Sequence, residues 1–88
     1  MSQDPKGGQV IAQVTDVYEG AAPYAVAWPK GFTESVTFSL DWDSDVWKDD
    51  ETPIKGEFVV LDDLRRNAKG WRAYSARFMR PEDEAKQK

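Results

Sequence analysis

Apolar and polar residues alternate with a period of two along most of this chain, which is typical of half-buried β-strands. The clearest example is the segment ESVTFSLDW, residues 34–42, in which four apolar residues alternate with four polar ones. The apolar residues, which we expect to face the core, are Val36, Phe38, Leu40 and Trp42. The polar residues, which we expect to face solvent, are Ser35, Thr37, Ser39 and Asp41.

Four other segments predict strands, because they are bounded by Gly, Pro and Asp. They are residues 9–18, 24–28, 57–61 and 71–78. The segment at 57–61 is apolar on both faces. In the last segment, one predicted face carries Tyr74, Ala76 and Phe78, and the other carries Trp71, Ala73, Ser75 and Arg77. Residues 61–70 fit either a short helix that ends at Gly70 or a hairpin connection.

The number and order of these strands predict an all-β fold, a small five-stranded antiparallel barrel. Closure removes the sheet edges that so short a chain has no other way to protect. An OB-like barrel fits the strand number and length best, and a smaller SH3-like barrel is the alternative. We expect one domain over residues 8–80, with flexible ends at residues 1–7 and 81–88.

The composition excludes several classes of function. The chain has no cysteine and no histidine, so disulfides, thiolate chemistry, Cys/His zinc sites and the usual neutral-pH general base are absent. We therefore expect neither an enzyme nor a bound cofactor. The longest uncharged run, residues 20–29, contains two prolines and is too short to span a bilayer. A soluble cytoplasmic protein without a membrane partner is expected.

The acidic segment DWDSDVWKDDET, residues 41–52, has the length of a calcium-binding loop. An EF-hand loop needs glycine at its sixth position for the turn and glutamate at its twelfth to close on the ion. Those positions hold Val46 and Thr52 here. We therefore expect no metal site in this segment.

Charge is strongly segregated, although the net charge is only −4. Residues 41–63 hold nine acidic residues against two lysines, whereas residues 65–80 hold five arginines and one lysine with no acidic residue. Such asymmetry indicates possible partners better than the net charge does. The basic segment also carries aromatic rings, which is the combination that single-stranded nucleic acids require.

The segment PIKGEFVVLDDLRRNAKGWRAYSARF, residues 53–78, resembles the last two strands of cold-shock and S1-type RNA-binding OB domains. The matching positions of the G-x-x-V and KG-x-x-A patterns are Gly56, Val59, Lys69, Gly70 and Ala73. The opening GQVIAQVTDVYEG is similar to the first strand of the same domains. The aromatic runs of cold-shock strands two and three are missing, apart from VTFSL at the position of the second. The resemblance implies nucleic-acid binding on an OB barrel.

Cations that can meet phosphates and rings on which bases can stack define the candidate nucleic-acid site. The candidates are Trp28, Lys30, Phe32, Arg65, Arg66, Lys69, Trp71, Arg72 and Arg77. Alternation favours a core position for the remaining rings Phe38, Phe58, Tyr74 and Phe78. Trp28 and Trp71 fit either role, and the arginines alternatively pair with Asp62, Asp63 and the acidic tail.

The acidic segment 41–53 offers a different function, because Trp42 and Trp47 lie among its carboxylates. Aromatic anchors within a charged rim are typical of protein interaction sites. Alternatively, both rings cover an open end of the barrel. The sequence thus predicts a binding module for single-stranded RNA or DNA, of low affinity because of the nearby acidic segment, with a protein interaction domain as the alternative.

Overall fold

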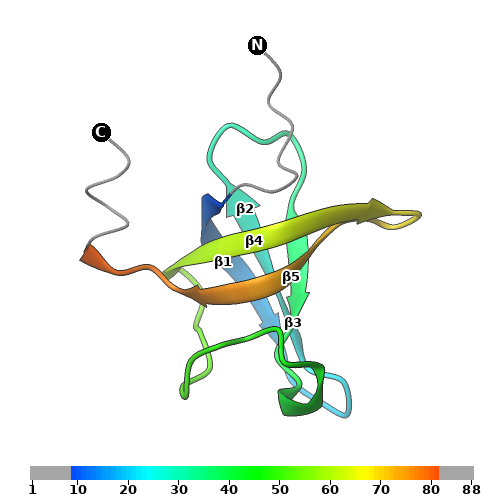
Figure 1. Ribbon diagram of the computed structural model, residues 1–88, viewed down its shortest axis with the longest axis vertical. Coiled ribbons are helices and arrows are strands. Elements are labelled where there is room, and N and C mark those ends of the chain that lie inside the picture. Colours follow the sequence, from blue (N-terminus) through cyan, green and yellow to red (C-terminus); the bar gives the residue numbers. More distant parts are fainter. Residues whose placement is uncertain (1–8, 82–88) are drawn as a thin grey trace.

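The computed structural model describes residues 9–81, which form a five-stranded barrel (Figure 1). The strands are β1 (Val10–Tyr18), β2 (Tyr24–Pro29), β3 (Val36–Ser39), β4 (Phe58–Asn67) and β5 (Gly70–Phe78), and a 3₁₀ turn η1 (Trp42–Ser44) follows β3. They close in the order β1-β2-β3-β5-β4, which confirms the predicted OB-like barrel. The predicted flexible ends lie outside the described residues, except for Pro81. No helix within residues 9–81 has the length and apolar character that a membrane crossing requires.

One seam of the predicted antiparallel barrel is parallel. β3 and β5 run in the same direction, with Val36 opposite Trp71 and Thr37 opposite Arg72. The other four strand pairs are antiparallel. A closed ring with an odd number of strands cannot alternate direction at every seam, and so one parallel pair is unavoidable.

The third strand is shorter than its alternating pattern predicted. Val36 and Phe38 are buried as expected, but β3 ends at Ser39. Ser39 was wrongly predicted to face solvent and is buried. Its hydroxyl accepts a hydrogen bond from the Asp41 backbone N–H at 3.1 Å, and the Asp41 carboxylate accepts one from the Asp43 N–H at 3.0 Å. These local side-chain bonds turn the chain into η1. Trp42 is consequently 71% exposed instead of buried.

The segment between the last two predicted strands is a hairpin, not a helix, because β4 continues to Asn67 and β5 starts at Gly70. The alternation of inward and outward side chains on β4 is interrupted at Asp63, whose φ of 53° is left-handed. Leu61 and Leu64, three residues apart, therefore both point into the core.

The same change of face occurs on β5, where Ala73 and Ala76 are both buried. The prediction that Tyr74 shares a face with Ala76 was therefore wrong, and Tyr74 is 39% exposed. Phe58 was also wrongly predicted to lie in the core. It is 47% exposed, because its neighbour Val59 takes the inward position at the start of β4.

The acidic connection between β3 and β4 closes one end of the barrel. Trp47 is only 7% exposed; its ring stacks on Phe38, with centroids 5.7 Å apart, and meets Phe78 edge-on at 4.9 Å. The backbone around it pairs with β5, because the Ala76 N–H donates to the Val46 carbonyl at 2.9 Å and the Lys48 N–H donates to the Ala76 carbonyl at 2.9 Å. The connection thus lies beside β5 where β3 has already ended.

Candidate functional site

A groove of about 480 Å³ crosses the outer face of β3. It lies between the β1–β2 loop and the tip of the β4–β5 hairpin, which projects beyond the barrel in Figure 1. We call it the β3 groove, and it is lined by Ala22, Pro23, Tyr24, Thr37, Ser39, Asp41, Asn67, Lys69, Trp71 and Arg72. OB barrels bind oligonucleotides and oligosaccharides over strands two and three, between the loops that join strands 1–2 and 4–5. The groove occupies that position.

The floor of the groove follows from strand pairing. Val26 lies opposite Thr37 on β3, Thr37 lies opposite Arg72 on β5, and Arg72 lies opposite Arg65 on β4. Directly paired residues project from the same face of a sheet, so one row of outward side chains crosses four strands. Its two middle members, Thr37 and Arg72, line the groove. The Arg72 guanidinium donates a hydrogen bond to the Thr37 hydroxyl at 3.3 Å. This contact holds the arginine along the floor.

Two aromatic rings line the groove, and each is held from behind. Tyr18 stacks on Tyr24 with ring centroids 4.9 Å apart and an interplanar angle of 24°. The Arg66 guanidinium lies over the Trp71 ring at 5.4 Å, and Phe32 meets that ring edge-on at 6.5 Å. None of these three backing groups lines the groove, and Trp71 also packs against the core.

Two of the predicted phosphate-binding arginines are already in ion pairs. Arg65 makes two hydrogen bonds of 3.1 Å to the carboxylate of Asp63, and this contact raises the pKa of Arg65 above its usual value. Its guanidinium also lies 4.8 Å from the centre of the Tyr74 ring. Arg66 pairs with Glu34 at 3.1 Å. Neither arginine lines the β3 groove.

The groove itself carries two cations and one carboxylate, which belong to Lys69, Arg72 and Asp41. Within residues 9–81, neither Lys69 nor Arg72 has a carboxylate at ion-pair distance. Lys69 is held at the hairpin tip because its backbone N–H donates to the Asn67 side chain at 2.9 Å. These two cations are therefore placed to bind an anionic ligand.

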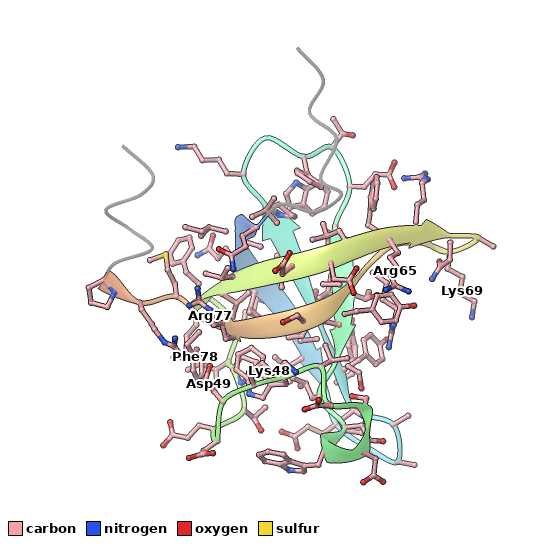
Figure 2. All side chains as sticks on the ribbon, in the orientation of Figure 1. Lys48, Asp49, Arg65, Lys69, Arg77 and Phe78 are labelled. Carbon is pink, nitrogen blue, oxygen red and sulfur yellow. The ribbon has the colours of Figure 1, made fainter. Side chains whose placement is uncertain are left out.

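The remaining predicted site residues lie elsewhere. Trp28, which is 46% exposed, and Lys30 line a separate hollow with Phe58, and the Trp28 indole N–H donates to the Phe32 carbonyl at 2.8 Å. Arg77 lies toward the opposite end of β5 from Lys69 (Figure 2), and donates to the Phe78 carbonyl at 3.2 Å. Of the nine predicted nucleic-acid-binding residues, the groove brings together three: Lys69, Trp71 and Arg72.

Sequence reasoning missed several groove residues, chiefly Tyr24, Thr37 and Asp41. A signal for Tyr24 was present in the segment YAVAW, where two alanines alternate with larger residues. Small residues suit the inside of a narrow barrel, which leaves Tyr24 on the outer face. Asp41 carried no such signal, because its place at the groove depends on the early end of β3.

The structure separates the two tryptophans of the acidic segment. Trp47 is buried against the core and exposes too little of its ring to anchor a partner, whereas Trp42 is exposed beside Asp41 and Asp43. Among residues 9–81, no group of three or more potential metal-ligating side chains is gathered around one point. The exposed part of this segment is therefore a tryptophan within a rim of carboxylates.

Comparison with protein families, curated proteins and solved structures finds no match for this chain. The resemblance of residues 53–78 to cold-shock and S1 domains therefore stays a prediction. A fold by itself does not specify a function, and the groove is the feature that indicates one.

Proposed function

We propose that this protein is a non-catalytic module that binds a single strand of RNA or DNA in the β3 groove. One observation carries the proposal: a single groove is lined by two aromatic rings and two cations. The rings are Tyr24 and Trp71, each packed against a neighbouring side chain. The cations are Lys69 and Arg72, which have no carboxylate partner within residues 9–81. Rings stack bases and cations meet phosphates. Oligosaccharides also bind at this position of OB barrels, but they carry no phosphate and leave the two cations without a role.

The expected affinity is low. Two cations neutralise about two phosphates, so the logarithm of the binding constant should fall by about 1.4 for each tenfold rise in salt. That slope corresponds to a loss of roughly 25-fold in affinity. Stacking adds about 1 to 3 kcal/mol for each base. The rings are already held in place, which reduces the entropy lost on binding, but the acidic segment repels phosphates and opposes the approach of a strand.

Titration of the 15N-labelled protein with short single strands at low salt tests the proposal. Shifts should gather on β3, on the tip of the β4–β5 hairpin and on the β1–β2 loop. Arg72→Gln should lower the affinity and reduce the salt slope by about 0.7, since one phosphate loses its cation. Tyr24→Ala should lower the affinity and leave the slope unchanged, because stacking releases no counterions.

Arg65→Gln is the matched control. It changes the net charge as Arg72→Gln does, but Arg65 is paired with Asp63 and lies outside the groove lining. We expect it to affect binding much less than Arg72→Gln does. Equal losses for the two variants would indicate attraction to net charge alone. No shift in the groove with several hundred micromolar protein at low salt would refute the proposal.

The exposure of Trp42 favours a second candidate, the docking of another protein on the acidic segment. An exposed ring surrounded by carboxylates provides an apolar anchor with a charged rim. The partner would need a basic surface around an apolar pocket. Trp42→Ala should abolish such binding and leave oligonucleotide binding unchanged, because Trp42 does not line the β3 groove. Loss of both activities in this variant would contradict the separation of the two sites.

A further inference from the structure

The β3 groove has two chemically different sides. Its cations, Lys69 and Arg72, come from the β4–β5 hairpin, whereas its carboxylate belongs to Asp41, which caps η1 after the end of β3. A phosphate is attracted to the first side and repelled by the second. A nucleotide that lies across the groove must therefore place its phosphate toward the hairpin. Its base then points toward Asp41, at the end of the groove where Tyr24 lies opposite Ser39.

Asp41 is held in a defined orientation. Its backbone N–H donates to Ser39, and its Oδ1 atom accepts from the Asp43 N–H at 3.0 Å. An ionised carboxylate has about four acceptor positions on its two oxygens, so most of them remain for a ligand. Within residues 9–81, no cation lies at ion-pair distance from Asp41. Asp41 lies where the groove meets a second hollow beside Trp42, and its carboxylate only accepts hydrogen bonds.

Bases differ in how well they match such a group. Guanine presents two neighbouring N–H donors on its Watson–Crick edge, which can meet both oxygens of one carboxylate. Cytosine and adenine each present one amino group beside a ring nitrogen acceptor. Uracil and thymine present one N–H between two carbonyl oxygens, which a carboxylate repels. Unpaired bases in a single strand are commonly read on this edge, and a good bidentate contact discriminates by roughly 5- to 100-fold.

Resting on the proposed function, we infer that Asp41 determines base specificity and makes the β3 groove prefer guanine over cytosine and adenine, and these over uracil or thymine. Asp41 also caps the 3₁₀ turn η1, and a purely structural role would give no base preference. Asparagine is an equally good cap. However, it has one acceptor oxygen instead of two, and its amide N–H₂ repels the amino groups that a carboxylate attracts. Asp41→Asn therefore separates the two roles.

The experiment compares four pentanucleotides of uridine whose central position is G, C, A or U. One central guanine in a uridine host avoids the self-association of guanine runs. Wild-type protein should bind the guanine probe roughly 5- to 100-fold more tightly than the all-uridine probe, with the other two between. Asp41→Asn should reduce this ratio to nearly one, through weaker binding of the guanine probe and tighter binding of the uridine probe.

Asp43→Asn is the matched control, because it removes the same charge from a neighbouring residue that does not line the groove. It should raise the affinity for all four probes alike and preserve their ratio. Melting temperatures of both variants establish that they fold, and the wild-type ratio tests the inference without any substitution.

The outcomes separate the inference from the proposed function. Equal affinity of wild-type protein for all four probes overturns the inference and leaves nucleic-acid binding intact. An equal gain for all probes in Asp41→Asn, as in Asp43→Asn, also overturns it, since Asp41 then acts only through its charge. If none of the four probes binds, the proposed function fails, and the inference fails with it.

Discussion

The Asp49 carboxylate accepts a hydrogen bond from the backbone N–H of Phe78, with Oδ2 2.7 Å from the nitrogen. The two residues lie close together at the end of β5 in Figure 2. The Arg80 guanidinium also approaches Asp49, at 3.9 Å. This contact joins the acidic connection to the last residue of the barrel's final strand. The connection is therefore part of the fold and not an independent appendage.

Asp49→Ala should reduce the free energy of unfolding by about 1.5 to 3 kcal/mol, because it removes a charged acceptor and leaves a partly buried N–H without its partner. Asp49→Asn keeps an acceptor oxygen and should cost less. Urea unfolding measures both values. Wild-type stability for Asp49→Ala would show that the barrel does not depend on this contact.

Phe38→Ala should cost about 3 to 5 kcal/mol, from lost apolar burial and the cavity that remains. The Phe38 ring is fully buried and stacks on Trp47. Phe58→Ala provides the control, since this exposed ring should change the stability by less than about 1 kcal/mol. The comparison requires thermal or urea unfolding of both variants. A Phe38→Ala protein as stable as Phe58→Ala would place Phe38 at the surface.

The two tryptophans of the acidic segment should also behave differently. Trp47→Ala should destabilise the protein by about 3 to 5 kcal/mol, whereas Trp42→Ala should stay within about 0.5 kcal/mol of the wild type. Acrylamide should quench the fluorescence of Trp42 strongly and that of Trp47 weakly, as single-tryptophan variants can show. Similar quenching of both rings would contradict the burial of Trp47.

Substitution of Asp63 tests the change of face in the β4–β5 hairpin. Valine is strained at the left-handed φ of 53°, and Asp63→Val should therefore cost about 1 to 2 kcal/mol more than Asp63→Gly. Both variants lose the exposed pair with Arg65, so this loss cancels in the comparison. Equal melting temperatures for the two variants would indicate that the backbone at this position does not need its left-handed conformation.

Calcium at millimolar concentration should leave the melting temperature nearly unchanged. The acidic segment lacks the turn glycine and the final glutamate of an EF-hand loop. A calorimetric or fluorescence melt with and without calcium measures the effect. A saturable rise of several degrees would reveal a site.

The strands were predictable because alternation reports which residues face a core, as Val36 and Phe38 did. The strand ends, and the side of the sheet on which each residue lies, were harder to predict where a local contact interrupted the alternation. Ser39 and Asp41 end β3 through hydrogen bonds to the backbone, and Asp63 changes the inward face through one left-handed residue. Neither effect leaves a periodic signal in the sequence.

The candidate site was predictable only where its residues are neighbours in the chain. Lys69, Trp71 and Arg72 belong to one hairpin, and the structure brings these three together in one groove. Trp28 projects from the outer face of β2 into a different hollow, and Arg65 forms an ion pair with Asp63. The place of Trp28 depends on how the strands pair across the barrel, which composition and charge do not specify. The Arg65 pair is local, between residues two apart on β4, and is the alternative that the sequence left open for the arginines.

The short parallel pairing of β3 with β5 affects where the barrel opens transiently. Only two residue pairs join β3 to β5, and three of the four residues involved, Thr37, Trp71 and Arg72, also line the β3 groove. Strands joined by few residue pairs separate more readily than strands joined by many. A ligand that contacts both β3 and β5 stabilises the paired state. Ligand binding in the groove should then favour the pairing of β3 with β5. The amide protons of Thr37 and Arg72 should be where a bound strand slows hydrogen exchange most.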